Sequence, residues 1–292
     1  MVESIRNKSG IKMKIDSHHH FWKYNVNDYS WITDEMKVLQ KDFFPQDLLP
    51  ELKQQGFDGS VAVQARQTLD ETRWLLELAK RYSFIRGVVG WVDLCSDRLE
   101  QQLEEFAKEP KFIGVRHVVH DEPDDEFMAR RDFQRGIGIL AKYDLSYDLL
   151  IFPKHLSLAA DLVSQFPGQR FVLDHLAKPN IRQQERATWE RGFGLISQHG
   201  NVSCKLSGMV TEADWDGWKV DDFKYYLDAA LKYFGPDRLM FGSDWPVCKL
   251  AGSYDRILAL VENYLGSSEL IIRDKIMGLN CQRIYNLART SG

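Results

Sequence analysis

Residues 14–22, Lys-Ile-Asp-Ser-His-His-His-Phe-Trp, decide how this 292-residue chain is built. The run begins as a strand, carries three histidines where that strand is predicted to end and continues into two aromatic residues. Side chains alternate between the two faces of a strand, so we expect His18 and His20 on one face and His19 on the other. Two imidazoles on one face can hold one metal ion or one substrate oxygen. A purification tag would lie outside the fold, whereas this run lies inside a predicted strand; a buried, hydrogen-bonded structural pair stays the alternative.

Outward from this stretch, strand-like and helical segments alternate along the chain. The predicted strands cover residues 12–17, 60–65, 85–92, 112–119, 145–152, 170–174, 202–206 and 238–242. The predicted helices cover residues 44–56, 71–82, 98–108, 126–143, 154–166, 184–199 and 221–234, then 254–265, 269–277 and 281–288. The strands are near-continuous apolar runs, which is typical of parallel strands that are buried on both faces.

Eight such alternations predict an α/β fold of the (β/α)8 TIM-barrel type. We expect one barrel domain over residues 13–292 and a loose tail over residues 1–12, because no change of composition marks an internal boundary. A doubly wound open sheet would alternate in the same way, but no Gly-x-Gly-x-x-Gly motif follows the first strand.

The composition excludes several classes of partner. A net charge of −4 offers no basic surface for nucleic acid. No apolar run approaches the ~18 residues of a membrane span, and residues 1–12 lack the apolar core of a secretory signal. The four cysteines are far apart and form no Cys-x-x-Cys pair, which favours reduced thiols in a cytoplasmic protein. The composition leaves open whether the chain forms a homo-oligomer.

Polar and aromatic residues collect at the predicted strand ends, where the active site of a (β/α)8 barrel forms. In strand order these residues are His18 and His20; Gln64 and Arg66; Trp91 and Asp93; Arg116, His117 and His120; Tyr147 and Asp148; Asp174, His175 and Lys178; Lys205; and Asp244. Alternation predicts that His117 faces outward if Arg116 faces the barrel interior.

We expect His18, His20, His175 and Asp244 to converge across the mouth of the barrel. Three neutral imidazoles and a carboxylate suit one divalent, zinc-like ion with an open position for water. Asp244 could then accept a proton from that water as general base. Taken singly, His175 could be a hydrogen-bonded structural residue and Asp244 a helix cap.

Four segments together resemble a known family. They are residues 14–22, Leu-Asp-His-Leu-Ala-Lys-Pro at 173–179, Lys-Leu-Ser-Gly at 205–208 and Met-Phe-Gly-Ser-Asp-Trp-Pro at 240–246. This combination is similar to the amidohydrolase superfamily, and more narrowly to the amidohydrolase-2 type, which contains sugar-lactone hydrolases such as L-fuconolactonase and L-rhamnonolactonase.

The resemblance implies a (β/α)8 barrel whose catalytic centre is lined by His18, His20, His175 and Asp244. It implies that Asp244 activates water and that Arg116, Lys178 and Lys205 contact the substrate. Binuclear members carry a bridging carboxylated lysine or glutamate on the fourth or fifth strand, whereas this chain has Arg116, His117, Tyr147 and Asp148 there. We therefore expect one divalent metal ion or none.

The expected activity is hydrolysis of a small-molecule sugar lactone of the L-fucono or L-rhamnono type to its sugar acid. We expect Trp22, Trp31 and Trp91 to supply flat apolar walls for the sugar ring, with Gln64, His117 and Tyr147 as further contacts. Two alternatives stay open. One is a metal-dependent carboxy-lyase of the same superfamily that acts on an aromatic acid, and the other is a barrel that binds sugar acids without turnover.

Overall fold

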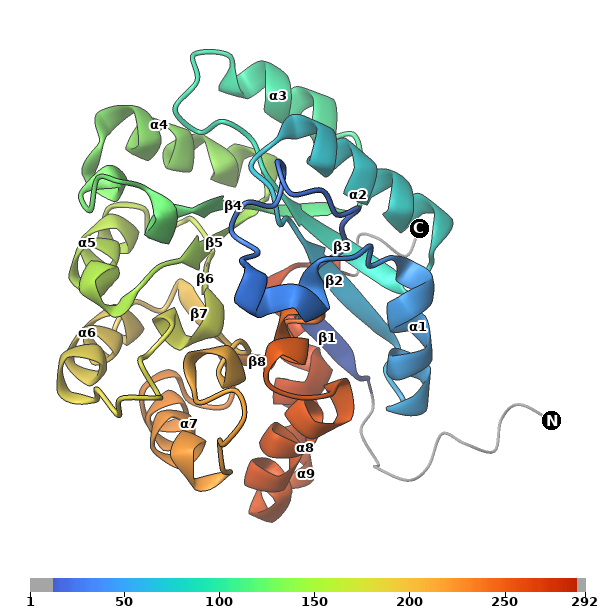
Figure 1. Cartoon of the computed structure of the whole chain (residues 1–292). Coiled ribbons are helices and arrows are strands. Elements are labelled where there is room, and N and C mark those ends of the chain that lie inside the picture. Colours follow the sequence, from blue (N-terminus) through green and yellow to red (C-terminus); the bar gives the residue numbers. More distant parts are fainter. Residues whose placement is uncertain (1–12, 288–292) are drawn as a thin grey trace.

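The computed structural model describes residues 13–287 of the chain (Figure 1), so the predicted tail over residues 1–12 lies outside the described residues. Eight strands of this part form one parallel sheet and pair in sequence order. They are β1 (Ile15–His19), β2 (Gly59–Val63), β3 (Ile85–Gly90), β4 (Phe112–Val118), β5 (Ser146–Leu150), β6 (Phe171–Leu173), β7 (Val202–Leu206) and β8 (Leu239–Phe241).

Helices follow the strands and surround them, as Figure 1 shows, so the predicted (β/α)8 barrel is confirmed. The α-helices are α1 (Pro45–Gln54), α2 (Leu69–Arg81), α3 (Leu99–Phe106), α4 (Arg131–Leu140), α5 (Leu156–Gln165), α6 (Ala187–Ser197), α7 (Asp221–Phe234), α8 (Tyr254–Tyr264), α9 (Leu270–Asp274) and α10 (Asn280–Ile284). None of the helices within residues 13–287 combines the length and the apolar character that a membrane span requires.

The core has two parts because each strand buries both of its faces. The larger cluster lies between the strands and the surrounding helices. The smaller cluster joins side chains of β1, β2, β3, β4, β6 and β8 to Cys281, Ile284 and Tyr285 at the end of the chain. α10 therefore helps to fill the inside of the barrel. Tyr285, which follows α10, also makes a polar contact there, since its hydroxyl donates to Asp148 at 2.6 Å.

Two predicted helices are interrupted. The helix predicted over residues 126–143 is α4 with a short 3-10 helix on either side, because Arg130 is extended (φ −61°, ψ 135°) and pairs with Asp132 in the first turn of α4. The helix predicted over residues 269–277 continues from α9 into a π-helical turn, Lys275–Leu279. Gly278 in that turn packs so closely on the carbonyl of Met13 that a side chain there would collide with it.

β1 extends further than predicted, so His18 and His19 lie inside the strand. The edge of β1 that does not pair with β2 lies next to β8. Single hydrogen bonds, rather than a continuous backbone ladder, form most of this contact, which we call the seam between β1 and β8. The amide of Asp244 donates to the carbonyl of His18 at 2.8 Å, and the amide of His20 donates to the carbonyl of Trp245 at 2.7 Å. Ser17 adds a bond from its hydroxyl to the carbonyl of Phe241 at 2.6 Å. This seam brings Asp244 next to the histidines of β1.

The segment between β1 and α1 passes in front of the strands in the view of Figure 1. Trp22 and Phe43 pair through two backbone bonds of 3.0 and 2.9 Å at the base of this segment. Asp28, further along, forms an ion pair of 2.6 Å with Arg66 after β2. These contacts attach the segment between β1 and α1, which we call the aromatic segment, to the barrel.

Candidate active site

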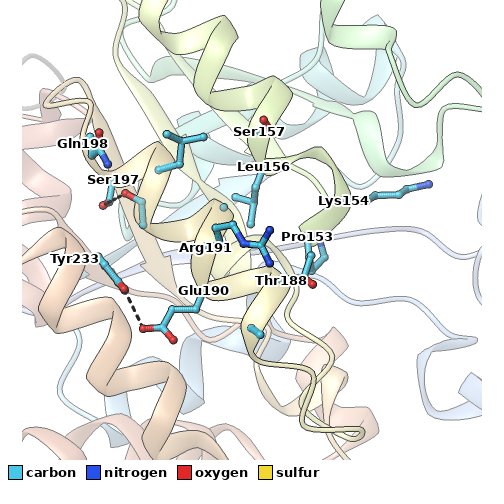
Figure 2. A pocket seen from close by; sticks show the side chains of 14 residues that line it. Pro153, Lys154, Leu156, Ser157, Thr188, Glu190, Arg191, Ser197, Gln198 and Tyr233 are labelled. Atoms are coloured by element: carbon cyan, nitrogen blue, oxygen red, sulfur yellow. Dashed lines mark hydrogen bonds between the residues drawn. The ribbon is translucent and has the colours of Figure 1, made fainter.

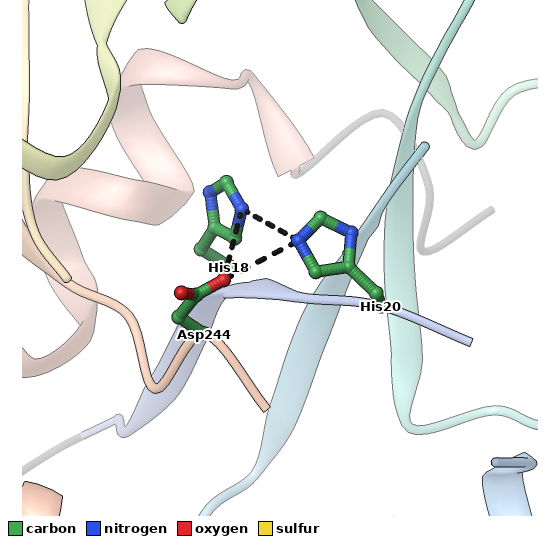
Figure 3. A group of neighbouring side chains, drawn as sticks. All are labelled: His18, His20 and Asp244. Carbon is green, nitrogen blue, oxygen red and sulfur yellow. Dashed lines mark hydrogen bonds and ion pairs between the residues drawn. The ribbon is translucent and has the colours of Figure 1, made fainter. Parts of the chain in front are cut away.

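Four residues predicted from the sequence meet at the seam between β1 and β8. Nε2 of His18 lies 3.1 Å from Nε2 of His20. Oδ1 of Asp244 lies 3.3 Å from Nε2 of His20, 3.8 Å from Nε2 of His18 and 4.0 Å from Nε2 of His175. Figure 3 shows the side chains of His18, His20 and Asp244 pointing toward one another from β1, from the residue after β1 and from the loop after β8. All four residues are buried.

The second ring nitrogen of each histidine is held by another group. Nδ1 of His20 donates to the carbonyl of Val63 at 2.8 Å, which leaves the lone pair of its Nε2 free because a carbonyl can only accept. Nδ1 of His175 is hydrogen-bonded to Oγ of Ser207 at 2.8 Å. Nδ1 of His18 lies 3.4 Å from Oδ1 of Asp174. The three Nε2 atoms therefore face the common centre, each oriented by a separate partner.

The donor set fits one divalent metal ion. His18, His20 and Asp244 each offer one ligand atom within 4.8 Å of the others, and so do His18, Asp174 and His175. Imidazole nitrogen and carboxylate oxygen suit zinc, and second-shell bonds such as those of His20 and His175 are usual around zinc ligands. The side chains of this centre could hold such an ion.

A buried network of ion pairs lies beside the histidines. Nζ of Lys205 is 2.6 Å from Asp148 and 3.0 Å from Asp174, and it lies 3.2 Å from Nδ1 of His18. Nη1 of Arg116 is 3.1 Å from Asp174 and 3.3 Å from Nε2 of His18. Two fixed positive charges therefore reach the centre from β4 and β7, and Asp174 orients both of them.

Burial and neighbouring charges together set the protonation states of the centre. Burial alone would raise the pKa of Asp244, but His175 and the hydrogen bond to His20 bring that pKa below its ordinary value. Burial lowers the pKa of His175 to about 4 and, with the charge of Lys205, holds the pKa of His18 well below 6.5. Burial opposes the charge of Lys205, yet Asp148 and Asp174 raise its pKa. At neutral pH His18 and His175 are therefore neutral, Asp244 is ionised and Lys205 is charged.

The backbone at two of these residues is left-handed, although neither is glycine. Asp244 has a φ of 56° and His175 a φ of 54°. Gly208 also has a positive φ of 61°, and a β-carbon there would lie 2.4 Å from Nδ1 of His175. Such conformations concentrate at functional sites, where the surrounding structure enforces them.

The other predicted contact residues fall into two groups. Gln64 is buried next to the centre, where its backbone and side-chain oxygens accept hydrogen bonds from Arg116. Lys178 follows His175 and forms an ion pair of 2.5 Å with Glu212. Trp31 is partly exposed on the aromatic segment and packs edge-on against the fully buried Trp22. Substrate contact by these residues stays a prediction.

Two predicted contacts are placed elsewhere by the structure. Tyr147 is fully buried between Phe133 and Phe171, on the outer face of β5, because Asp148 takes the inward position. His117 faces outward, as alternation predicts, and its ring stacks on Phe127. One of its nitrogens accepts from the indole of Trp91 at 3.2 Å and the other is bonded to Glu122 at 2.6 Å. We therefore leave Tyr147 and His117 out of the site.

Three residues of the centre had no role assigned from the sequence. Asp148 and Asp174 stand at strand ends, but only the fold shows that both face Lys205. Ser207 directly follows β7, and its bond to His175 joins residues 32 positions apart. Ser207 lies two residues after the predicted strand-end Lys205, within the quoted segment Lys-Leu-Ser-Gly at 205–208, and this position is a signal that could have pointed to it.

Two hollows on the described structure lie away from this centre. A groove of about 1180 Å³ runs between α5 and α6, where Figure 2 shows Tyr233 pointing to Glu190 across its lower edge. A second hollow of about 710 Å³ lies where the loops after β5, β6 and β7 meet and includes Phe152, Lys178 and Glu212. Neither is lined by His18, His20 or Asp244, so the chemistry is not assigned to them.

Known proteins resemble this chain over nearly its whole length. A family model described as amidohydrolase matches residues 15–287. An L-fucono-1,5-lactonase of Burkholderia multivorans is 41% identical over 94% of this chain and 96% of its own length. An L-fucono-1,5-lactonase of Burkholderia ambifaria is 36% identical over 97% of this chain and 98% of its own length.

Solved structures show the same relationship. An amidohydrolase from Burkholderia multivorans with bound zinc superposes with a TM-score of 0.91 at 40% identity, over 94% of this chain and 99% of that one. A 2,6-dihydroxybenzoate decarboxylase from Rhizobium shares 15% identity with a TM-score of 0.65, which shows the common fold alone. On the family model and on relatives that are aligned over nearly their whole length, this chain belongs to the amidohydrolase family.

Proposed function

We propose that this protein hydrolyses the ester bond of a sugar lactone, with L-fucono-1,5-lactone as the first candidate, and releases the sugar acid. The observation that carries the proposal is the Asp244 carboxylate facing the Nε2 atoms of three histidines, with the Arg116 guanidinium beside them. The names of the two relatives supply the substrate class.

Asp244 is the general base in this proposal. Its carboxylate takes a proton from the attacking water, because its lowered pKa keeps it ionised at neutral pH. The resulting hydroxyl oxygen forms a bond to the lactone carbonyl carbon. The protonated Asp244 then returns the proton to the ring oxygen as the ester bond breaks, which leaves the sugar acid and restores the carboxylate.

Arg116 stabilises the negative charge that develops on the carbonyl oxygen. Its guanidinium is fixed before substrate arrives by Asp174 and by Gln64, so no reorganisation is needed during the reaction. Lys205 adds positive charge from behind His18, where Asp148 and Asp174 hold it. A divalent ion bound by His18, His20 and Asp244, with His175 beside them, would polarise the same carbonyl and lower the pKa of bound water.

Specificity for the sugar is proposed to come from residues around the centre. Lys178 lies three residues after His175 and Trp31 lies on the segment between β1 and α1, and both keep part of their surface exposed. We place the reaction in carbohydrate metabolism, since a sugar lactone is the substrate. We also propose a cytoplasmic location, which accords with four free cysteines in the described structure.

The test is a pH-indicator assay over a panel of aldono-1,4- and aldono-1,5-lactones, including L-fucono-, L-galactono- and L-rhamnono-lactones. We expect acid release by the wild-type protein and a loss of at least 100-fold in Asp244→Asn, the size typical of removing a general base. Asp161→Asn, on the exposed face of α5, is the matched control and should keep full activity.

Other outcomes would redirect the assignment. Carbon dioxide release from an aromatic acid, without hydrolysis of any lactone, would support the carboxy-lyase alternative. Tight binding of sugar acids with no turnover of any lactone would support a binding protein. Either result would overturn the proposed function.

A further inference from the structure

His175 begins a backbone turn of an unusual kind. His175, Leu176, Ala177 and Lys178 have φ angles of 54°, 53°, 59° and 50°, so four successive residues with side chains are left-handed. The left-handed conformation costs each such residue about 1–2 kcal/mol and is normally adopted by single residues. A run of four persists only if contacts from outside the turn compensate for this cost.

Trp189 in α6 supplies one such contact. Its indole N–H donates to the carbonyl of Leu176 at 2.7 Å, in the middle of the turn. The indole itself is immobilised, because it is 1% exposed and its ring lies 4.6 Å from that of Phe193 and 5.0 Å from that of Tyr226. A rigid donor therefore fixes the direction of one carbonyl of the turn.

That carbonyl belongs to the residue directly after His175, so it lies in the same left-handed turn as the imidazole. The amide of Lys178 closes the turn by donating to the carbonyl of His175 at 2.7 Å. If the Leu176 carbonyl rotated away, the turn could relax toward a right-handed conformation. The backbone conformation of His175 would then change with it. Nε2 of His175 lies 4.0 Å from Asp244, and the hydrogen bond to Ser207 holds only the other ring nitrogen, Nδ1.

We propose that Trp189 is a positioning residue for catalysis, because its N–H holds the left-handed turn that presents His175 to Asp244. Trp189 acts through Leu176 and takes no part in the bond changes. The inference rests on the proposed lactone hydrolysis only for its kinetic consequence; the conformation of the turn can be measured without substrate.

The first test compares two tryptophans. Trp189→Phe keeps an aromatic ring and removes the N–H. Trp218→Phe is the matched control, since Trp218 is also buried and donates to a backbone carbonyl, that of Ala251 at 2.8 Å, far from the turn in sequence. Hydrogen–deuterium exchange of a peptide containing residues 176–181 reports on the Lys178 amide. We expect faster exchange there, and a kcat at least ten-fold lower, in Trp189→Phe alone.

The second test asks whether strain in the turn is the cause. Glycine adopts a positive φ without steric cost, so Ala177→Gly should stabilise the turn when Trp189 no longer holds it. In the Trp189→Phe background this change should restore at least a third of the wild-type kcat. A purely structural role for Trp189 in the core predicts no rescue.

Each result has a defined meaning. Unchanged exchange in Trp189→Phe, an equal loss of kcat in Trp218→Phe, or no rescue by Ala177→Gly would overturn the inference. If the wild-type protein hydrolyses no lactone, the proposed function fails, while the exchange of residues 176–181 in the four proteins still decides whether Trp189 holds the turn.

Discussion

Glu71 is a buried carboxylate that holds a loop at the mouth of the barrel. Its Oε2 accepts from the backbone amides of Ala65 at 3.0 Å and Arg66 at 2.7 Å, in the loop between β2 and α2. Burial raises the pKa of Glu71 to about 7, although both amides act against that rise. Ionisation of Glu71 therefore lowers the stability of the folded protein, and the size of this loss depends on pH.

Replacing Glu71 by glutamine should stabilise the protein at high pH relative to low pH. The folded-state pKa lies above the unfolded value of 4.5, so the contribution of Glu71 to stability is fully present below about pH 4.5 and is lost as the pH rises through 7. The free energy of unfolding of Glu71→Gln minus that of the wild type should increase by about 1–3 kcal/mol between pH 5 and pH 8. Urea unfolding at both pH values measures this, with the exposed Glu77→Gln as control. A difference that does not change with pH would contradict the assignment.

Gly208 is required by its neighbour His175 as well as by its own φ. A β-carbon at position 208 would lie 2.4 Å from Nδ1 of His175. We expect Gly208→Ala to lower kcat at least ten-fold and to destabilise the fold by about 1–2 kcal/mol, the cost of a left-handed alanine. Gly168→Ala, where a new β-carbon would meet nothing within 4 Å, should leave kcat unchanged. Full activity in Gly208→Ala would show that the imidazole can move without consequence.

At the scale of elements, the seam between β1 and β8 is both the closing contact of the barrel and the place where the candidate site forms. Asp16 reinforces it from β1, because its carboxylate accepts from the amide of Ser243 at 2.9 Å and from the hydroxyl of Tyr254 in α8 at 3.0 Å. Side-chain bonds here replace part of the regular backbone ladder. The spacing of His18 and Asp244 therefore depends on a few polar side chains.

Removing one of these bonds should destabilise the barrel. Ser17→Ala takes the hydroxyl donor from the buried carbonyl of Phe241, which should lower the free energy of unfolding by about 1–3 kcal/mol. Ser164→Ala removes a similar bond of 2.7 Å to the carbonyl of Asp161 on an exposed helix and should change stability by less than about 0.5 kcal/mol. Denaturant unfolding of both variants tests this, and equal effects would argue against a special role for the seam.

At the scale of the whole molecule, a ligand that bridges β1 and the loop after β8 should stabilise the entire barrel. Zinc at 100 times its dissociation constant would add about 2.7 kcal/mol to the free energy of unfolding, if it binds the folded state only. We expect this gain in the wild type and in His199→Ala, whose histidine follows α6, and a loss of most of it in His20→Ala. Scanning calorimetry of chelator-treated and zinc-loaded protein measures this gain in stability. An equal gain in all three would place the ion elsewhere.

The barrel was predictable because its signals are local. Each strand is an apolar run buried on both faces, and each polar residue at its end can be read from position alone, as with His18, His175 and Asp244. Errors arose where a side-chain contact, either distant in sequence or local, decided the outcome. Asp148 occupies the inward position next to Lys205, so Tyr147 turns to the helices. Arg130 interrupts a predicted helix through its pairing with Asp132.

The amino-acid sequence was sufficient to predict the fold class, the face shared by His18 and His20, and the set of strand ends from which catalytic groups could come. These follow from the two-residue period of strands and from the order of apolar and polar segments. The three-dimensional fold was needed to show which nitrogen of each imidazole faces the centre, that Lys205 lies between Asp148 and Asp174, and that His175 stands on a left-handed turn to which the Trp189 indole donates. Those features depend on bonds between residues far apart in the chain, whose geometry no local pattern specifies.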